Sequence, residues 1–104
     1  MQPMIRQGDI LLIQVNAMPG GLPEVPAEAG RVILAHGEVT GHHHSVDAVC
    51  ARLLGSDEND RFLAVSAATM LTHQEHAPLG LAPGIYRVIR QREYTPEAIR
   101  RVED

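Results

Sequence analysis

The sequence predicts an all-β fold: one small single-domain barrel or sandwich covering residues 1–104, with a short C-terminal helix. Three observations lead to this prediction. Short apolar runs rich in branched side chains recur along the chain, turn-forming residues separate them, and helical periodicity is confined to the last ten positions. At 104 residues, the chain can build one hydrophobic core but not two.

The first half of the chain contains three predicted strands. Asp9 to Val15 is an apolar, branched run with Gly8 before it, so we expect a strand buried on at least one face. Ala17 to Gly30 holds three prolines and three glycines, which predict a long surface loop. Strand character returns in Arg31 to Ala35 and again in Ser45 to Leu54, which alternates for part of its length.

The second half contains a hairpin and two further strands. The polar stretch Gly55 to Arg61 lies between two apolar runs and predicts a hairpin turn, with Arg61 to Ser66 as the returning strand. Ala68 to His73 is expected to be another strand, and Pro78 to Gly84 a turn-rich connection. Ile85 to Tyr94 should form the last strand.

The final residues have the pattern of a helix start. Thr95 can serve as an N-cap, Pro96 suits the first helical position, and Glu97 lies where the helix dipole favours an anion. We therefore predict a helix over residues 96–104.

Charge and composition favour some classes of protein over others. Nine arginines against thirteen acidic residues give a net charge of −4, which disfavours binding to the phosphate backbone of nucleic acids. Cys50 is the only cysteine, so an intramolecular disulfide and a cysteine-rich zinc site are excluded. The N-terminus lacks a leader pattern and apolar runs are too short to span a bilayer, which predicts a cytoplasmic protein with no membrane partner.

Four of the six histidines lie in one short stretch around GEVTGHHHSV, between His36 and His44. Side chains alternate across a strand, so His42 and His44 should project from one face and His43 from the other. The pair His42 and His44 can therefore act as a two-ligand clip. His36 and His43 are not expected to be ligands.

The other two histidines, His73 and His76, flank Glu75 at the end of a predicted strand. A turn there would let both rings converge with the first pair. Imidazole binds Zn, Fe, Ni and Cu, so we predict a divalent transition metal of unassigned identity. Glu75 could orient a ligand or act as a general base, and it is our candidate catalytic residue. The predicted ligands are His42, His44, His73 and His76.

The segments GEVTGHHH and LTHQEHAPLGLAPGIYRVIRQREYTPEAIRRVED resemble a family of small uncharacterised proteins of bacteria and phages. Members begin with a Gly-Asp strand, here QGDILLI, and carry Gly-Glu-Val-Thr-Gly-His-x-His, His-x-Glu-His, Pro-Gly-x-Tyr and Arg-Glu-Tyr motifs. The resemblance covers nearly the whole chain and brings no established activity. It implies a site built from His42, His44, His73, Glu75 and His76.

The cupin superfamily of small metal-binding barrels is similar in its His-x-His pair. The acidic residue expected four or five positions after that pair is missing, because Ala48 and Val49 stand there. No histidine follows Pro83 and Gly84 at cupin spacing. The likeness is therefore architectural, a barrel with a histidine-lined opening, and architecture alone does not assign chemistry.

Two functions remain open at this point. The first is a metal-binding barrel with hydrolytic or oxidative activity, which could take a small-molecule ligand. The second is a non-catalytic interaction module, phage-derived and assembled as a homo-oligomer, in which the histidines are structural. Whether the protein is an enzyme is undecided between them. Nucleic-acid binding through the C-terminal arginines ranks last, because aromatic residues for stacking are scarce.

Overall fold

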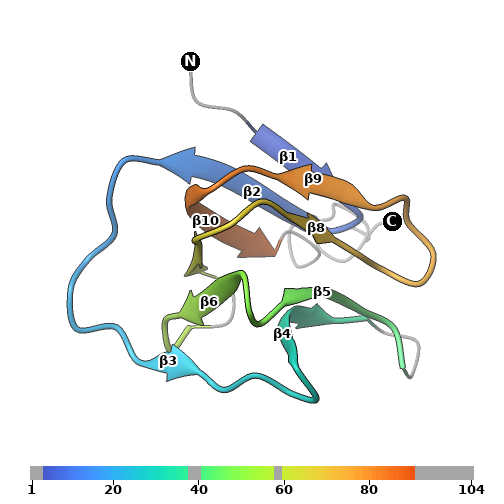
Figure 1. Cartoon of the computed structure of the whole chain (residues 1–104), viewed down its shortest axis with the longest axis horizontal. Coiled ribbons are helices and arrows are strands. Elements are labelled where there is room, and N and C mark those ends of the chain that lie inside the picture. Colours follow the sequence, from blue (N-terminus) through green and yellow to red (C-terminus); the bar gives the residue numbers. More distant parts are fainter. Residues whose placement is uncertain (1–3, 38–40, 58–59, 91–104) are drawn as a thin grey trace, which may run out of the picture.

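The computed structural model describes residues 4–37, 41–57 and 60–90, and all its regular elements are strands (Figure 1). The all-β prediction is confirmed for these residues. They contain no helix capable of crossing a membrane. The predicted helix over 96–104 and the end of the last predicted strand lie outside the described residues. The strands are β1 Met4–Gln7, β2 Ile10–Val15, β3 Glu24–Val25, β4 Arg31–His36, β5 His43–Asp47, β6 Ala51–Leu54, β7 Asp60–Val65, β8 Thr69–Leu71, β9 Leu79–Leu81 and β10 Gly84–Arg90.

One six-stranded sheet and two hairpins make up the fold. The large sheet has the order β1-β2-β10-β7-β6-β3, and β4 pairs with β5 and β8 with β9 in two separate two-stranded sheets. All pairings between the described strands are antiparallel, as expected for strands joined by short turns. The large sheet ends in two edge strands, β1 and β3. The sheets of the described residues are therefore not closed into a barrel, which was one of the two predicted architectures.

The strands β2 and β10 are neighbours in the interior of the large sheet. Residues Ile10–Leu12 are all buried, which means that β2 is covered on both faces, since successive side chains point to opposite sides. In β10, Tyr86 and Val88 are buried and Arg87 between them is exposed. The continuous apolar run of β2 is therefore typical of a strand covered on both faces, and the alternation in β10 is typical of a strand with one solvated face.

The hairpins pack onto the large sheet through one hydrophobic core. Fully burying a leucine stabilises a fold by about 1.5–3 kcal/mol, so the buried leucines from both hairpins and the sheet hold the three parts together. A backbone bridge between Ser45 and Thr72 also joins β5 to the end of β8. The members of the core cluster that are almost fully buried include Ile10, Leu12, Leu34, Val46, Leu53, Leu63, Leu71, Leu81 and Val88.

The predicted strand Ser45 to Leu54 is wrong in one respect: it is two strands, β5 and β6, separated by a turn. The carboxylate of Asp47 accepts a hydrogen bond from the amide of Val49 at 2.9 Å, and its carbonyl accepts one from the amide of Cys50 at 3.0 Å. An aspartate that bonds to the backbone two residues on favours a turn over a strand. The alternation of apolar residues concealed this signal.

Besides the two-residue strand β3, two short strands lie where no strand was predicted. Met4–Gln7 (β1) pairs with β2 at the edge of the large sheet, and Leu79–Leu81 (β9), inside the predicted turn-rich connection, pairs with β8. Both are held by backbone hydrogen bonds to a neighbour, which local composition does not reveal. The loop over 17–30 is as predicted, apart from the two-residue edge strand β3.

Candidate functional site

Three segments that are distant in sequence meet beside the core. They are the β1–β2 turn at residues 7–9, the start of β5 at residues 42–44, and the connection after β8 at residues 73–76. Side-chain contacts between all three segments, given below, define one polar site at their junction. The end of β10 adds Arg90 to it.

The rings of His42, His44, His73 and His76, here called the imidazole group, lie side by side. The centre of the His44 ring is 4.4 Å from that of His73 and 6.0 Å from that of His76. The centres of His73 and His76 are 4.6 Å apart, and those of His42 and His73 are 5.7 Å apart. Ring contacts thus link the four histidines that the sequence singled out, with His42 joined to the others through His73.

Strand alternation explains which histidines meet. His42 and His44 both reach His73, whereas the ring of His43 lies 6.2 Å from that of His36. His36 and His43 form a separate pair on the paired strands β4 and β5, where they are direct neighbours. They do not belong to the imidazole group.

His44 is the buried member of the group, and Gln7 fixes its ring. The side-chain amide nitrogen of Gln7 donates to the carbonyl oxygens of Leu71 and Ala77, each at 3.0 Å. These two bonds orient the amide so that its oxygen faces Nδ1 of His44 at 2.8 Å. An oxygen can only accept there, so Nδ1 of His44 carries a proton.

The other ring nitrogen of His44 faces a carboxylate. Nε2 lies 3.2 Å from Oδ1 of Asp9, and the second oxygen of Asp9 accepts a hydrogen bond from Nε of Arg90 at 3.1 Å. Arg90 is itself buried and also donates to the backbone carbonyl of His36. Asp9 is therefore held between an arginine on one side and an imidazole on the other.

The protonation states follow from burial and neighbouring charge. Burial, reinforced by the nearby His73 and His76, lowers the pKa of His44 to about 4, although Asp9 acts in the opposite direction. Burial would raise the pKa of Asp9, but the hydrogen bond and charge of Arg90, helped by His44, hold it below its ordinary value. At neutral pH, His44 is neutral and Asp9 is ionised.

Glycine is required at position 8 between Gln7 and Asp9. Its φ of +61° lies in the left-handed region, which side chains other than glycine rarely adopt. A side-chain carbon there would lie 2.8 Å from Nε2 of His76 and 3.2 Å from Cε1 of His44. The β1–β2 turn therefore packs directly against the imidazole group.

Glu75 lies outside the imidazole group. Its carboxylate is 3.8 Å from Nδ1 of His42, and its side chain is 65% exposed. Its backbone amide donates to Nδ1 of His73 at 3.0 Å, which closes the turn between the two histidines. Partial burial and the charges of His76 and His42 lower the pKa of His73, which leaves that ring neutral at pH 7.

Within the described residues, no three His, Cys, Asp or Glu side chains are already arranged to hold a metal ion. The ring nitrogens are engaged elsewhere: those of His44 face Gln7 and Asp9, and Nδ1 of His73 accepts the amide of Glu75. Metal–nitrogen bonds of about 2.0–2.1 Å place ligand ring centres roughly 4.5–5.2 Å apart. The observed separations of 4.4, 4.6, 5.7 and 6.0 Å lie on both sides of this range.

Sequence reasoning missed Gln7, Asp9 and Arg90. Gln7 and Asp9 stand in a short turn before a strand, where polar residues are usually solvated. Arg90 lies in the last predicted strand, and arginine side chains are mostly exposed. The Gly-Asp pair in QGDILLI is the one local signal, because it lies in the same motif set as the histidines.

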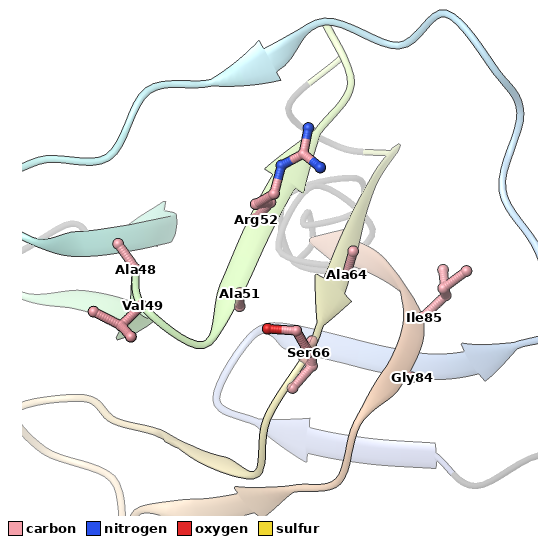
Figure 2. Close-up of a pocket in the computed structure, with 9 residues that line it drawn as sticks. Ala48, Val49, Ala51, Arg52, Ala64, Ser66, Gly84 and Ile85 are labelled. Carbon is pink, nitrogen blue, oxygen red and sulfur yellow. The ribbon is translucent and has the colours of Figure 1, made fainter.

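A hollow elsewhere on the molecule does not involve the histidines (Figure 2). It has a volume of about 360 Å³ and is lined mainly by small residues of β6, β7 and β10, such as Ala51, Ala64 and Gly84. Of its polar side chains, Arg52 already pairs with Glu24 at 3.1 Å, and Ser66 donates to a backbone carbonyl. It therefore presents few groups that could orient a ligand.

Comparison with known proteins gives one match. The model of a protein family described as Domain of unknown function (DUF8820) matches residues 6–91. This range includes the β1–β2 turn, all six histidines and Arg90. No match was found among curated proteins or solved structures.

Proposed function

The chain belongs to the Domain of unknown function (DUF8820) family, and we propose that this member is a metal-binding protein. The metal is a divalent transition ion such as Zn, Fe, Ni or Cu, for which imidazole is a suitable ligand. The candidate ligands are the members of the imidazole group: His42, His44, His73 and His76.

The observation that carries the proposal is the packing of the His73 and His76 rings against the buried ring of His44, with His42 beside His73. A metal needs the unprotonated ring nitrogen, and burial lowers the pKa of His44 to about 4 and also lowers that of His73. Metal-binding histidines usually donate their second nitrogen to an oxygen acceptor, as Nδ1 of His44 does to Gln7. Nε2 of His44 is then the nitrogen available to a metal.

If one coordination position is open, the site supports hydrolytic or oxidative chemistry. In that case Glu75 is the candidate base. Its exposed carboxylate lies 3.8 Å from the His42 ring, which supports a role in taking a proton from a molecule bound beside the imidazole group. The reaction itself is not assigned by these residues.

One observation favours a second function, a non-catalytic and oligomeric interaction module. Both nitrogens of His44 already face protein side chains, and the described residues contain no preformed metal site. In this view, the buried histidine joins β5 to the β1–β2 turn, and the outer rings pack on it. Its role would be to hold the fold rather than to bind an ion.

Metal titration of untagged protein separates the two functions. We expect one Zn²⁺ per chain by calorimetry and elemental analysis. The double variant H73A/H76A, which alters the two outer rings and spares the buried one, should lose it. The matched control H36A/H43A removes the other histidine pair and should bind like the wild type. Folded wild type that takes up no Zn²⁺ would support the structural role instead.

A further inference from the structure

We propose that Asp9 is a ligand of the same metal and that Arg90 holds it in position, which makes the centre a mixed imidazole–carboxylate site. This inference rests on the proposed function and adds to it a residue from the β1–β2 turn. It changes the site from one built by two histidine segments to one that needs the N-terminal strands as well.

The first argument is the contact between His44 and Asp9. The side-chain oxygen of Gln7, oriented by two backbone carbonyls that bind its amide nitrogen, faces Nδ1 of His44 at 2.8 Å and holds the ring in one orientation. The other ring nitrogen, Nε2, is thereby directed at Oδ1 of Asp9 at 3.2 Å. An imidazole nitrogen and a carboxylate oxygen are both ligands of divalent transition metals, and here they face one point.

The second argument is distance. Two ligands bound to one metal at about 2.0–2.2 Å, with angles between roughly 90° and 110°, are separated by about 2.9–3.5 Å. The separation of 3.2 Å between Nε2 and Oδ1 is within that range. The pair therefore needs little movement to bind an ion, and only the partly buried His73 ring or the exposed His76 ring must turn to supply a third ligand.

The third argument is that only one oxygen of Asp9 is available. Arg90 donates to Oδ2 at 3.1 Å, and a second donor of the same guanidinium is bound to the carbonyl of His36. The Arg90 side chain is 9% exposed and its guanidinium has two partners, so it prevents the carboxylate from rotating away. Hydrogen bonds of this kind commonly orient a ligating carboxylate. Arg90 is accordingly a positioning residue.

A mixed site has a predictable metal preference. Adding a hard carboxylate oxygen to imidazole nitrogens favours Zn²⁺, Fe²⁺, Mn²⁺ and Co²⁺ and disfavours Cu⁺, which prefers thiolates and thioethers. It also makes Co²⁺ a direct probe, because its visible absorption changes when an oxygen ligand is lost.

The test is a Co²⁺ and Zn²⁺ titration of the wild type, D9N and D60N. D9N keeps the size of the side chain and removes its charge, and we expect at least a tenfold loss of affinity with a changed Co²⁺ spectrum. D60N is the matched control, since Asp60 pairs with Arg87 on the surface at 2.8 Å. It should bind like the wild type. If folded D9N binds with wild-type affinity and spectrum, Asp9 is not a ligand, and the all-imidazole proposal stands alone.

Two further measurements keep the inference open to refutation if D9N does not fold. In Zn²⁺-soaked crystals of the wild type, Oδ1 of Asp9 should lie about 2.0–2.2 Å from the metal. A carboxylate outside bonding distance rejects the inference, and a wild type that binds no metal rejects the proposed function with it. For Arg90, R90M should shift the Co²⁺ spectrum and R90K should restore most of it, which a purely structural role would not predict.

Discussion

The side-chain oxygen of Gln7 lies 2.8 Å from Nδ1 of His44, although the two residues are 37 positions apart in sequence. The same amide bonds to the carbonyls of Leu71 and Ala77, which bracket the connection that carries His73 and His76. One glutamine therefore joins all three segments of the site. Its amide group decides both where these segments meet and which nitrogen of His44 carries the proton.

Replacing Gln7 with leucine should destabilise the protein strongly. Q7L keeps the bulk of the side chain but leaves the ring N–H of His44 and two carbonyls without their partner. We expect the free energy of unfolding to fall by about 2–4 kcal/mol, the range for several unsatisfied buried groups. Urea denaturation measures it. The control is Q74L, because Gln74 accepts a single exposed hydrogen bond from the amide of His43 and should cost much less.

The metal-free protein should become less stable as the pH falls from about 6.5 toward 4. The pKa of native His44 is lowered to about 4 from the ordinary 6.5, so the unfolded chain takes up a proton that the native ring refuses. Stability is therefore complete above the ordinary pKa and lost below it, by at most about 3 kcal/mol from this ring. The lowered pKa of Asp9 extends the loss to lower pH.

Urea unfolding with a chelator present, measured at pH 7, 6, 5 and 4.5, checks this. H44Q removes the titrating ring while keeping a polar side chain, so its stability should depend less steeply on pH than that of the wild type. Equal slopes for the two proteins would show that His44 is not a buried neutral imidazole.

Alanine at position 8 should cost more than alanine at an open glycine with similar backbone. G8A combines a φ of +61° with a carbon 2.8 Å from Nε2 of His76. Gly21 has a φ of +79° and nothing within 4 Å of the added carbon, so G21A isolates the backbone contribution of about 1 kcal/mol. We expect G8A to lose roughly 1–2 kcal/mol more than G21A by thermal or urea unfolding. Equal losses would mean that the turn does not press on the imidazole group.

Much of the fold could be predicted because its strands are marked by their own residues. The branched run of β2 and the polar turn before β7 are local signals, and both elements lie where they were expected. The turn and the strand that the sequence did not predict share one cause. Asp47 turns the chain through bonds to its own backbone, and β9 is a strand because β8 lies beside it, so neither is visible in the spacing of apolar residues.

The candidate site was only half visible in the sequence. Histidine is a rare residue type, so two close pairs are a signal that the sequence itself contains. Strand alternation then predicts that the side chain of His43 points away from those of His42 and His44. Gln7, Asp9 and Arg90 are ordinary residue types in ordinary places, and their role depends on long-range contacts. Arg90 meets Asp9 across 81 positions of sequence, a contact that only the pairing of β10 with β2 creates.

Arg31 provides a test of how the scaffold supports the site. Its guanidinium donates to Oγ and the carbonyl of Ser45 and to Oγ1 of Thr72, at 2.9–3.2 Å. Ser45 and Thr72 also exchange backbone hydrogen bonds, and each directly precedes or follows a member of the imidazole group. Arg31 thus links the two segments that carry His44 and His73 through hydrogen bonds to Ser45 and Thr72.

R31M should therefore lower the free energy of unfolding by about 1–3 kcal/mol, since it removes charge-assisted bonds to partly buried acceptors. R52M is the control, because Arg52 pairs with Glu24 on an exposed surface and should cost at most about 1 kcal/mol. In the Zn²⁺ titration, R31M should also bind Zn²⁺ more weakly than R52M. The effect would be indirect, because the hydrogen bonds of Arg31 given above go to Ser45 and Thr72 and not to the ring of a proposed ligand. A variant that is less stable but binds Zn²⁺ unchanged would show that the imidazole group does not depend on Arg31, because Gln7 and the backbone bonds between Ser45 and Thr72 would then be enough to hold the His44 and His73 segments together.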